Sequence, residues 1–338
     1  MMRKNLSAKP GAERAPFRPD IILDFRPRET TQLLQFLLTA MSDRKRTTVK
    51  DYLKHRQVMV NGNVTTQFDF ELQSGDNVAV NTSREFQTLR NPRLSIVYED
   101  DDIVVVNKGY GLLSVGTDKI KTGTAYSILR DYLKRVDPRN KLFIVHRLDQ
   151  HTSGLMMFAK NVRAKEAMQH NWNNMVLERR YVCVVEGKLE QEEGEIRSYL
   201  AETSQHEVYS TDNPEAGQLA VTRYRVLKTA NGYTLVEVQL ETGRKNQIRV
   251  HMKELGHPIA GDRKYGAKTS PIHRLALHAM SLRFAHPASR TDMNFSTPIP
   301  APFAKMVKEL NFRLRSGVYI SKNAAGNGDR QGSKSPEK

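Results

Sequence analysis

Two Asn-Gly pairs beside short apolar stretches constrain the fold of this chain more than any other feature. Asn231-Gly232 separates apolar stretches at 221–227 and 234–240, and Asn61-Gly62 follows a third stretch at 58–60. An Asn-Gly pair in such a setting is the strongest short signal for a β-hairpin, and it leaves no room for the crossover helix that parallel neighbours require. The sequence therefore predicts antiparallel strand pairs in both halves of the chain.

Length and composition together predict two domains and two tails. The 338 residues exceed the roughly 250 to 300 at which a single core stops growing. Residues 26–80 are predicted to form two helices followed by short strands, residues 81–93 a polar linker, and residues 94–319 a larger domain. Residues 1–20, which are basic, and residues 323–338 lack apolar periodicity, so both are predicted to be disordered tails.

The fold class predicted for the larger domain is α+β, with a mixed, largely antiparallel sheet and flanking helices. Several strands are joined by turns too short for crossover helices, which argues against a doubly wound parallel sheet. The smaller domain is predicted to be a small α/β module. In the larger domain, strands are predicted at 103–107, 143–145, 155–158, 181–185, 221–227, 234–240 and 275–284, and helices at 125–136, 162–177, 247–255 and 303–310.

The charge balance predicts a polyanionic partner. The chain has 53 Lys and Arg residues against 37 Asp and Glu residues, a formal net charge of +16, which favours nucleic acid first and an anionic membrane surface second. No run approaches about 18 consecutive apolar residues, so no membrane-spanning helix is predicted. A basic cluster around the second predicted helix would bind phosphates, the alternative being a solvated helix face; its members are Arg44, Lys45, Arg46, Lys50, Lys54 and Arg56.

Cysteine, histidine and glycine spacing predicts neither a metal site nor a nucleotide cofactor. The lone Cys183 cannot form an intrachain disulfide, and the N-terminus lacks the apolar region of a secretory signal, so the cytoplasm is the expected location. Histidine pairs five and six residues apart do not match metal-ligand spacing. Gly109 and Gly111 begin a dinucleotide-like pattern that ends on Ser114 instead of a third glycine.

One polar run stands between two apolar segments. Residues 146–154 read HRLDQHTSG, and apolar stretches flank them at 142–145 and 155–158. Local chemistry leaves two interpretations open. The run is either a surface loop whose polar side chains satisfy backbone donors, or a loop that holds the Asp149 carboxylate beside basic groups at the edge of a sheet.

The polar run resembles the HRLDxxTSG motif of RNA pseudouridine synthases of the RluA type. Other stretches resemble motifs of the same family in the same order, and with the run they span residues 94 to about 300; they are NK…GL at 107–112, RYVCVVEG at 180–187, TGRKNQIRVH at 242–251, GDRKYG at 261–266 and LHA at 277–279. The chain departs from the family pattern at Gly109, Cys183 and Asn246, where Pro, Ala and His are usual. Residues 26–80 resemble the S-four RNA-binding module.

The resemblance implies roles for individual residues. Asp149 would be the catalytic carboxylate, Arg249 the cation that keeps it charged, and Tyr181 a ring that stacks on uracil and a phenol that moves a proton. Arg147 would occupy the space of a flipped base, its alternative being a structural partner of Asp149. His146 and Arg244 would face the RNA.

The resemblance also implies a function. The chain would be a monomeric isomerase that converts uridine to pseudouridine in large-subunit ribosomal RNA and needs no metal or cofactor, because the reaction involves no net redox change. Two alternatives stay open at this point. One is a transfer RNA pseudouridine synthase, and the other is a non-catalytic RNA-binding or ribosome-assembly protein.

Overall fold

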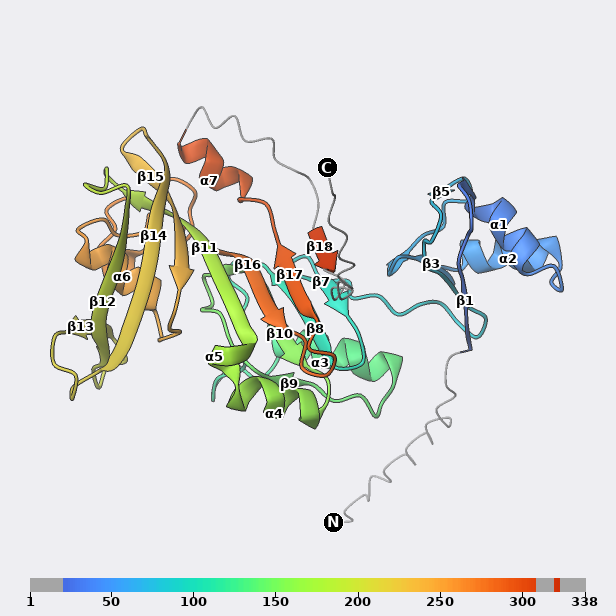
Figure 1. The fold of residues 1–338 in the computed structure, drawn as a ribbon, viewed down its shortest axis with the longest axis horizontal. Coiled ribbons are helices and arrows are strands. Elements are labelled where there is room, and N and C mark those ends of the chain that lie inside the picture. The colour runs from blue at the N-terminus through green and yellow to red at the C-terminus, as the bar shows by residue number, and fades with distance from the viewer. Residues whose placement is uncertain (1–20, 308–318, 323–338) are drawn as a thin grey trace, which may run out of the picture. The chain divides into compact units, whose positions relative to one another are not determined.

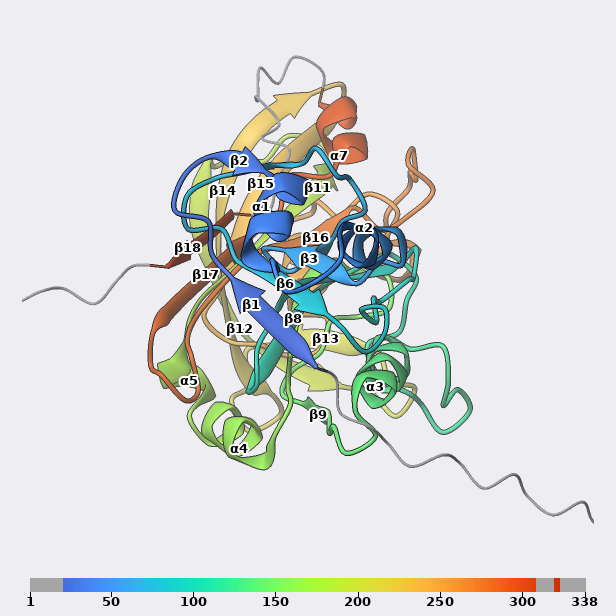
Figure 2. The ribbon, with the colours of Figure 1, turned by 90° about the vertical axis from the view of Figure 1, so that its right-hand side faces the viewer.

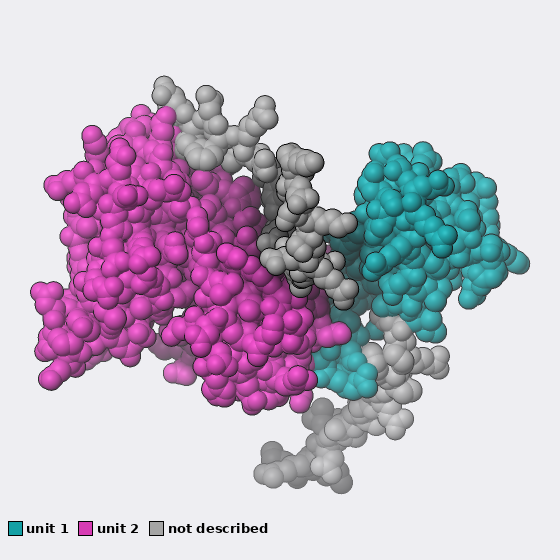
Figure 3. Space-filling view, viewed as in Figure 1, with its two compact units in different colours: residues 1–88, 132–140 teal, residues 89–131, 141–338 magenta. Residues whose placement is uncertain are grey.

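The computed structural model describes residues 21–307 and 319–322, and it divides into two compact units, coloured separately in Figure 3. Of the described residues, unit 1 comprises 21–88 and 132–140, and unit 2 comprises 89–131, 141–307 and 319–322. The tails predicted at 1–20 and 323–338 lie outside the described residues. Within the described ranges, no helix has the length and apolar character needed to cross a membrane.

Unit 1 packs two helices against a small antiparallel sheet (Figure 1). The helices are α1 (Leu33–Ala40) and α2 (Arg46–Lys54); the sheet has the order β1-β6-β3-β4, with bounds Ile22–Phe25, Val78–Asn81, Val58–Val60 and Asn63–Val64. A separate pair joins β2 (Thr31–Gln32) to β5 (Glu71–Leu72). Leu33, Leu37, Val49 and Leu53 bury one side of each helix, as the apolar spacing predicts.

The predicted limits of the small domain are too narrow. The strand β1 pairs with β6 from Ile22 onward, four residues before the predicted start at 26. At the other end, Phe86 is buried and its backbone N–H donates to the carbonyl of Arg56, so part of the predicted linker packs onto unit 1. The Asn61-Gly62 hairpin is confirmed, because both residues have the positive φ angles, 48° and 81°, that this turn requires.

Unit 2 is built on one large sheet. Its main path is β13-β12-β14-β15-β11-β16-β10-β8-β7, with β17 and β18 continuing from β16 and β9 pairing with β10. In order from β7 to β18 the strands are Leu94–Glu99, Ile103–Lys108, Phe143–Ile144, Ser153–Ala159, Val176–Glu186, Glu193–Glu202, Val208–Thr211, Gln218–Ala230, Tyr233–Leu240, Leu277–Ala285, Asp292–Ser296 and Tyr319–Lys322. All described pairs are antiparallel except β10 with β16, so the predicted fold class is confirmed.

Helices flank this sheet. Beyond residue 89 they are α3 (Ala125–Val136), whose residues from 132 onward belong to unit 1, α4 (Val162–His170), α5 (Trp172–Met175), α6 (Gln247–Glu254) and α7 (Ala301–Met306), with a 3₁₀ turn at Arg263–Tyr265. Figures 1 and 2 both show α4 and α5 at the start of β11 and α7 near its other end. The helix predicted as one piece at 162–177 is two helices, and α5 ends where β11 begins.

Sequence patterning missed several strands of unit 2. β12 has the sequence EGEIRSYLAE, and its side chains Glu193, Glu195 and Arg197 are exposed on one face of the sheet. A strand with so few apolar side chains lacks a strong period-2 signal. The strands β7, β13, β17 and β18 were missed as well. In contrast β10, SGLMMFA, is buried along its whole length, as its apolar run indicates.

Gly154 allows the one parallel contact of the large sheet. β10 meets β16 where Ser153 pairs with His278 and Gly154 with Ala279. Gly154 has a φ of +118°, and a Cβ placed on it would lie 2.2 Å from the carbonyl oxygen of Ala279. Only glycine permits both this backbone angle and this close approach.

We expect Gly154→Ala to lower the free energy of unfolding by about 3 kcal/mol or more, since it adds backbone strain to a clash with backbone atoms. Chemical denaturation measures the change. Gly232→Ala is the matched control: its φ is +75°, but no heavy atom lies within 4 Å of the added Cβ, so only about 1 kcal/mol of strain is expected. Equal losses in the two variants would contradict the role assigned to the Ala279 contact.

Candidate active site

A cavity of about 450 Å³ in unit 2 is lined by several residues of the polar run at 146–154, among them Asp149. It lies between the 145–152 loop, the strand β11, the turn at 241–244 and the start of α6. The principal polar side chains in its lining are Arg147, Asp149, Trp172, Arg179, Tyr181, Arg244, Asn246 and Arg249. The predicted catalytic residues Asp149, Tyr181 and Arg249, which are far apart in the sequence, therefore line a single cavity.

The backbone around Asp149 is held by a buried lysine and a buried serine. Lys108 has no exposed surface, and its ammonium group donates to the carbonyls of Leu112 and Gln150 at 2.8 and 3.2 Å. Ser114 Oγ donates to the carbonyl of Leu148 and accepts from its N–H. Burial lowers the pKa of Lys108 to about 7, and the Asp149 carboxylate opposes this shift. These contacts fix the loop on both sides of Asp149.

Arg249 joins two carboxylates, and the second was not predicted. Its Nε and Nη2 donate to the two oxygens of Asp262 at 2.7 and 2.8 Å, while its Nη1 lies 3.6 Å from an oxygen of Asp149. The side chain of Asp262 is 1% exposed, and that of Asp149 is 34% exposed. Burial opposes the charge on Arg249, but the hydrogen bonds to Asp262 and the attraction of Asp149 raise its pKa. The main partner of Arg249 is therefore Asp262.

Asn246, one of the departures from the family pattern, takes part in holding Arg249. Asn246 is the N-cap residue of α6 and has a φ of 55°. Its Oδ1 accepts a hydrogen bond from Arg249 Nη1 at 2.9 Å. Its amide donates to the hydroxyl of Tyr265 at 2.9 Å, and the guanidinium of Arg249 lies 4.7 Å from the centre of the Tyr265 ring. Asp262, Asn246 and Tyr265 together restrict Arg249 to one orientation.

Tyr181 supplies a protonated phenol to the cavity. It lies on β11 and is half-buried. Burial raises the pKa of the phenol, Arg179 lowers it, and the Asp149 carboxylate raises it, with a net rise. The hydroxyl therefore keeps its proton at neutral pH and can donate a hydrogen bond.

The residues predicted to face RNA around this cavity have different environments. Arg147 is exposed and makes no ion pair within the part of the chain that the structure describes, whereas Arg244 donates to the carbonyl of Leu219. His146 Nε2 accepts from the N–H of Met157 at 2.9 Å, and burial lowers its pKa to about 3, helped by Arg179. His146 is therefore neutral and forms part of the cavity lining, where the centre of its ring lies 5.0 Å from that of the Trp172 ring.

Arg179 is a cavity residue that sequence reasoning missed. Its guanidinium lies 5.8 Å from the Trp172 ring, and its Nη2 donates to the backbone carbonyl of Glu241 at 3.3 Å. A Cβ on Gly243 would lie 2.5 Å from Arg179 Nη1, so the glycine of the TGR motif provides the space for this guanidinium. The arginine two positions before Tyr181 was the signal in the sequence.

The basic cluster of the small domain separates into parts. Arg46, Lys50 and Lys54 lie at four-residue spacing on α2 and line one groove of unit 1. Arg44 pairs with Asp43 at 3.1 Å, and Arg56 lies 4.0 Å from Glu85. Lys45 is the N-cap residue of α2.

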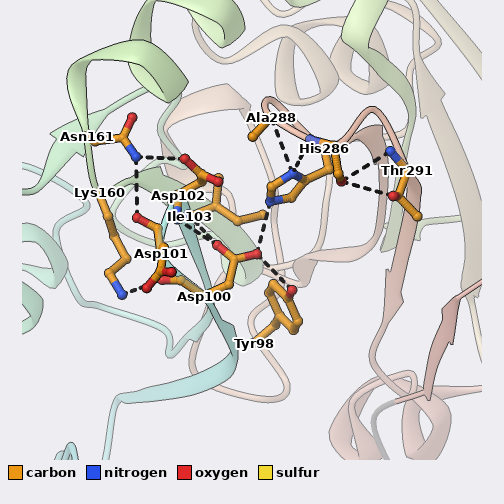
Figure 4. A network of polar contacts seen from close by, with 11 residues as sticks. Tyr98, Asp100, Asp101, Asp102, Ile103, Lys160, Asn161, His286, Ala288 and Thr291 are labelled. Atoms are coloured by element: carbon orange, nitrogen blue, oxygen red, sulfur yellow. Dashed lines mark hydrogen bonds and ion pairs between the residues drawn. The ribbon is translucent and has the colours of Figure 1, made fainter.

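One group of side chains in the described ranges has the spacing of metal ligands, but its atoms bond to protein. Asp100, Asp102 and His286 offer ligand atoms within 4.8 Å of one another. Figure 4 shows how these atoms are used: Asp100 accepts from Tyr98 and His286, and Asp102 accepts from Asn161. His286 Nδ1 accepts from backbone N–H groups, so Nε2 carries the proton. The network joins the β7–β8 turn to the turn after β16.

Comparison with known proteins identifies the family. A family model described as RNA pseudouridylate synthase matches residues 102–254. The Bacillus subtilis protein YlyB, an uncharacterised RNA pseudouridine synthase, is 37% identical over 283 residues, which are 82% of this chain and 93% of that protein. The chain belongs to the RNA pseudouridine synthase family. The family and the isomerase class predicted from the HRLDxxTSG run are thereby confirmed.

Further relatives support the same family. The Escherichia coli K12 protein named ribosomal large subunit pseudouridine synthase D is 31% identical over 294 residues, covering 82% of this chain and 90% of that protein. The solved structure of human RNA pseudouridylate synthase domain containing 4 aligns with a TM-score of 0.51 at 25% identity, over 62% of this chain and 90% of that one. The likeness of residues 26–80 to the S-four module stays a prediction.

We expect Asp262→Asn to lower the free energy of unfolding by about 3 kcal/mol, because it leaves the buried Arg249 without its bidentate carboxylate. Asp149→Asn should cost less than about 1 kcal/mol, since that carboxylate is one-third exposed and its ion pair is long. Urea denaturation of both variants measures the two changes. A larger loss for Asp149→Asn would show that Asp149 is the principal partner of Arg249.

Proposed function

We propose that this RNA pseudouridine synthase modifies uridines of large-subunit ribosomal RNA, with Asp149 as the catalytic carboxylate. The observation that carries the catalytic assignment is the position of Asp149 in the cavity, with Arg249 Nη1 3.6 Å from one of its oxygens. The choice of RNA is supported by the relative named ribosomal large subunit pseudouridine synthase D, of which this chain covers 90%.

The reaction places definite demands on the cavity. The bond between ribose C1′ and uracil N1 breaks, the base turns, and C1′ joins C5; a proton leaves C5 and N1 gains one, so no external reactant is consumed. The uridine must first leave its stack, because its reacting atoms are unreachable within a helix. The detached uracil must also be retained, which contacts with the residues that line the cavity can do.

Asp149 lies beside a cation, and Tyr181 keeps its proton. The carboxylate can attack C1′, attack the uracil ring, or accept a proton from the sugar, and each route requires its ionised form. Arg249 places a positive charge 3.6 Å from the carboxylate, while its bidentate bonds to Asp262 keep it from closing fully on Asp149. The protonated phenol of Tyr181 can exchange a proton with the base as C5 loses its hydrogen.

Arginines around the cavity match the phosphates on either side of a flipped nucleotide. Arg147 lies exposed at the cavity and can fill the gap left in the RNA stack. Arg244 contributes a second exposed guanidinium. Arg179 is held against Trp172 and the Glu241 carbonyl, and we assign it to a phosphate of the target nucleotide because no carboxylate within the described residues pairs with it.

We expect Asp149→Asn to abolish pseudouridine formation while RNA binding survives, because the variant keeps the shape of the side chain and loses only its charge. Pseudouridines are mapped in total RNA from cells that lack the protein and are complemented with wild type or Asp149→Asn. A large-subunit site restored by wild type alone supports the proposal. A restored site in transfer RNA would overturn the choice of RNA, and wild-type conversion by the variant would overturn the mechanism.

We expect Arg179→Gln to raise KM for target RNA about tenfold, since a charge-assisted contact to phosphate is lost. Gly243→Ala should raise KM in the same direction by displacing the guanidinium, and Arg179→Lys should restore part of the loss. Steady-state assays with a transcript of the mapped target measure KM and kcat separately. Arg130→Gln, which changes a partly exposed arginine of α3 outside the cavity lining, is the control. An unchanged KM for Arg179→Gln would exclude the phosphate contact.

A further inference from the structure

Unit 1 contains a groove with no role in the chemistry described above. Its volume is about 500 Å³, within the range of small-molecule sites. Leu34 of α1 and Leu53 of α2 are buried beneath it. Around this apolar floor stand polar and aromatic groups from three segments: Gln32 and Gln35, Arg46, Lys50 and Lys54, and Thr66 and Phe68.

The groove carries positive charge along one side. Arg46, Lys50 and Lys54 recur every four residues on α2, so they lie on one face of the helix. All three are exposed, none forms an ion pair within the part of the chain that the structure describes, and no carboxylate belongs to the lining. A row of unpaired cations at this spacing favours an anionic ligand with more than one charge.

The lining of the groove also includes an aromatic ring on a fixed backbone. Phe68 is 61% exposed, the largest exposed fraction among the described phenylalanines. Its carbonyl accepts from the N–H of Leu34 at 2.9 Å, and the carbonyl of Phe70 accepts from Leu33. The loop is thereby tied to the start of α1, so the ring is held beside the groove. An exposed ring in the same groove as a row of cations suits a ligand that has both a flat π-face and phosphate groups.

Two glutamine amides complete the groove. Gln32 and Gln35 are exposed, and their side-chain amides form no hydrogen bond with described residues. An amide can donate and accept at once, which matches the edge of a nucleobase. One groove therefore offers cations for a phosphate, an aromatic ring for the face of a base and amides for the edge of that base.

We propose that this groove binds one unpaired nucleotide of the RNA substrate, with the base stacked on Phe68 and its phosphates on Arg46, Lys50 and Lys54. The inference rests on the proposed function, since it takes RNA as the substrate. It adds a second recognition point, which reads whether the RNA is single-stranded at that position. Aromatic stacking distinguishes an unpaired base from a duplex, in which the faces of the bases are covered.

The test compares the affinity of the full chain for two probes, a short oligouridylate and an RNA duplex of the same length. We expect Phe68→Ala to weaken oligouridylate binding about fivefold or more, the loss of one stacked base, and to change duplex binding less than about twofold. Phe68→Tyr should retain both affinities. Tyr209→Ala, which removes an exposed aromatic side chain of β13, is the matched control. Lys50→Gln should weaken both probes and reduce the salt dependence by roughly one phosphate contact.

Each result supports or overturns the proposal that the groove binds an unpaired nucleotide. Equal affinity of wild type and Phe68→Ala for oligouridylate would overturn the proposal, as would an equal loss for both probes at an unchanged melting temperature. Displacement of oligouridylate by a polyglutamate peptide from wild type and from Phe68→Ala alike would favour an acidic protein partner and also overturn it. Binding is measured without turnover, so a failure of the proposed function would appear in the Asp149→Asn assay and not here.

Discussion

The paired contact of Arg249 with Asp262 is the interaction on which the rest of the site depends. A guanidinium with so little exposure needs a charged partner, and Asp262 provides it with both oxygens, which leaves one edge of the guanidinium for Asp149. Asp149 is thus attracted by a permanent cation without being captured in short hydrogen bonds. A carboxylate in this position keeps its oxygens available for a substrate. Asn246 and Tyr265 prevent Arg249 from turning away.

The second requirement is a backbone that brings Asp149 to that guanidinium. The loop after β9 is held by Lys108 and Ser114, both buried, and it leads into β10, which pairs with β16 at Gly154. The absence of a side chain at Gly154 sets how closely the two strands approach. The HRLDxxTSG run therefore combines two requirements, since its aspartate faces the cavity and its glycine belongs to the sheet. The sheet core and the cavity cannot be altered independently at this point.

Much of the fold could be predicted from local pattern, because turn chemistry and apolar periodicity act over a few residues. Asn61-Gly62 and Asn231-Gly232 form their hairpins, and α3 and α6 begin at the predicted residues 125 and 247. The prediction failed where local signals are weak. The strand β12 is mostly polar, and β1 pairs with a strand more than fifty residues away. Such strands form because a neighbour offers a free edge, which no short window of sequence records.

For the site, the sequence alone determined which residue types are present and in what order: a carboxylate at 149, a tyrosine at 181 and an arginine at 249. The resemblance to a known family then assigned these three residues to one active site. Only the tertiary structure decided which side chains pair with one another. In the folded chain, Asp262 is the principal partner of Arg249. His146 is neutral and forms part of the cavity lining, and Arg179 lies at the cavity beside Gly243. The physical reason is that pairing and burial depend on distances between segments far apart in the chain, and folding alone sets those distances.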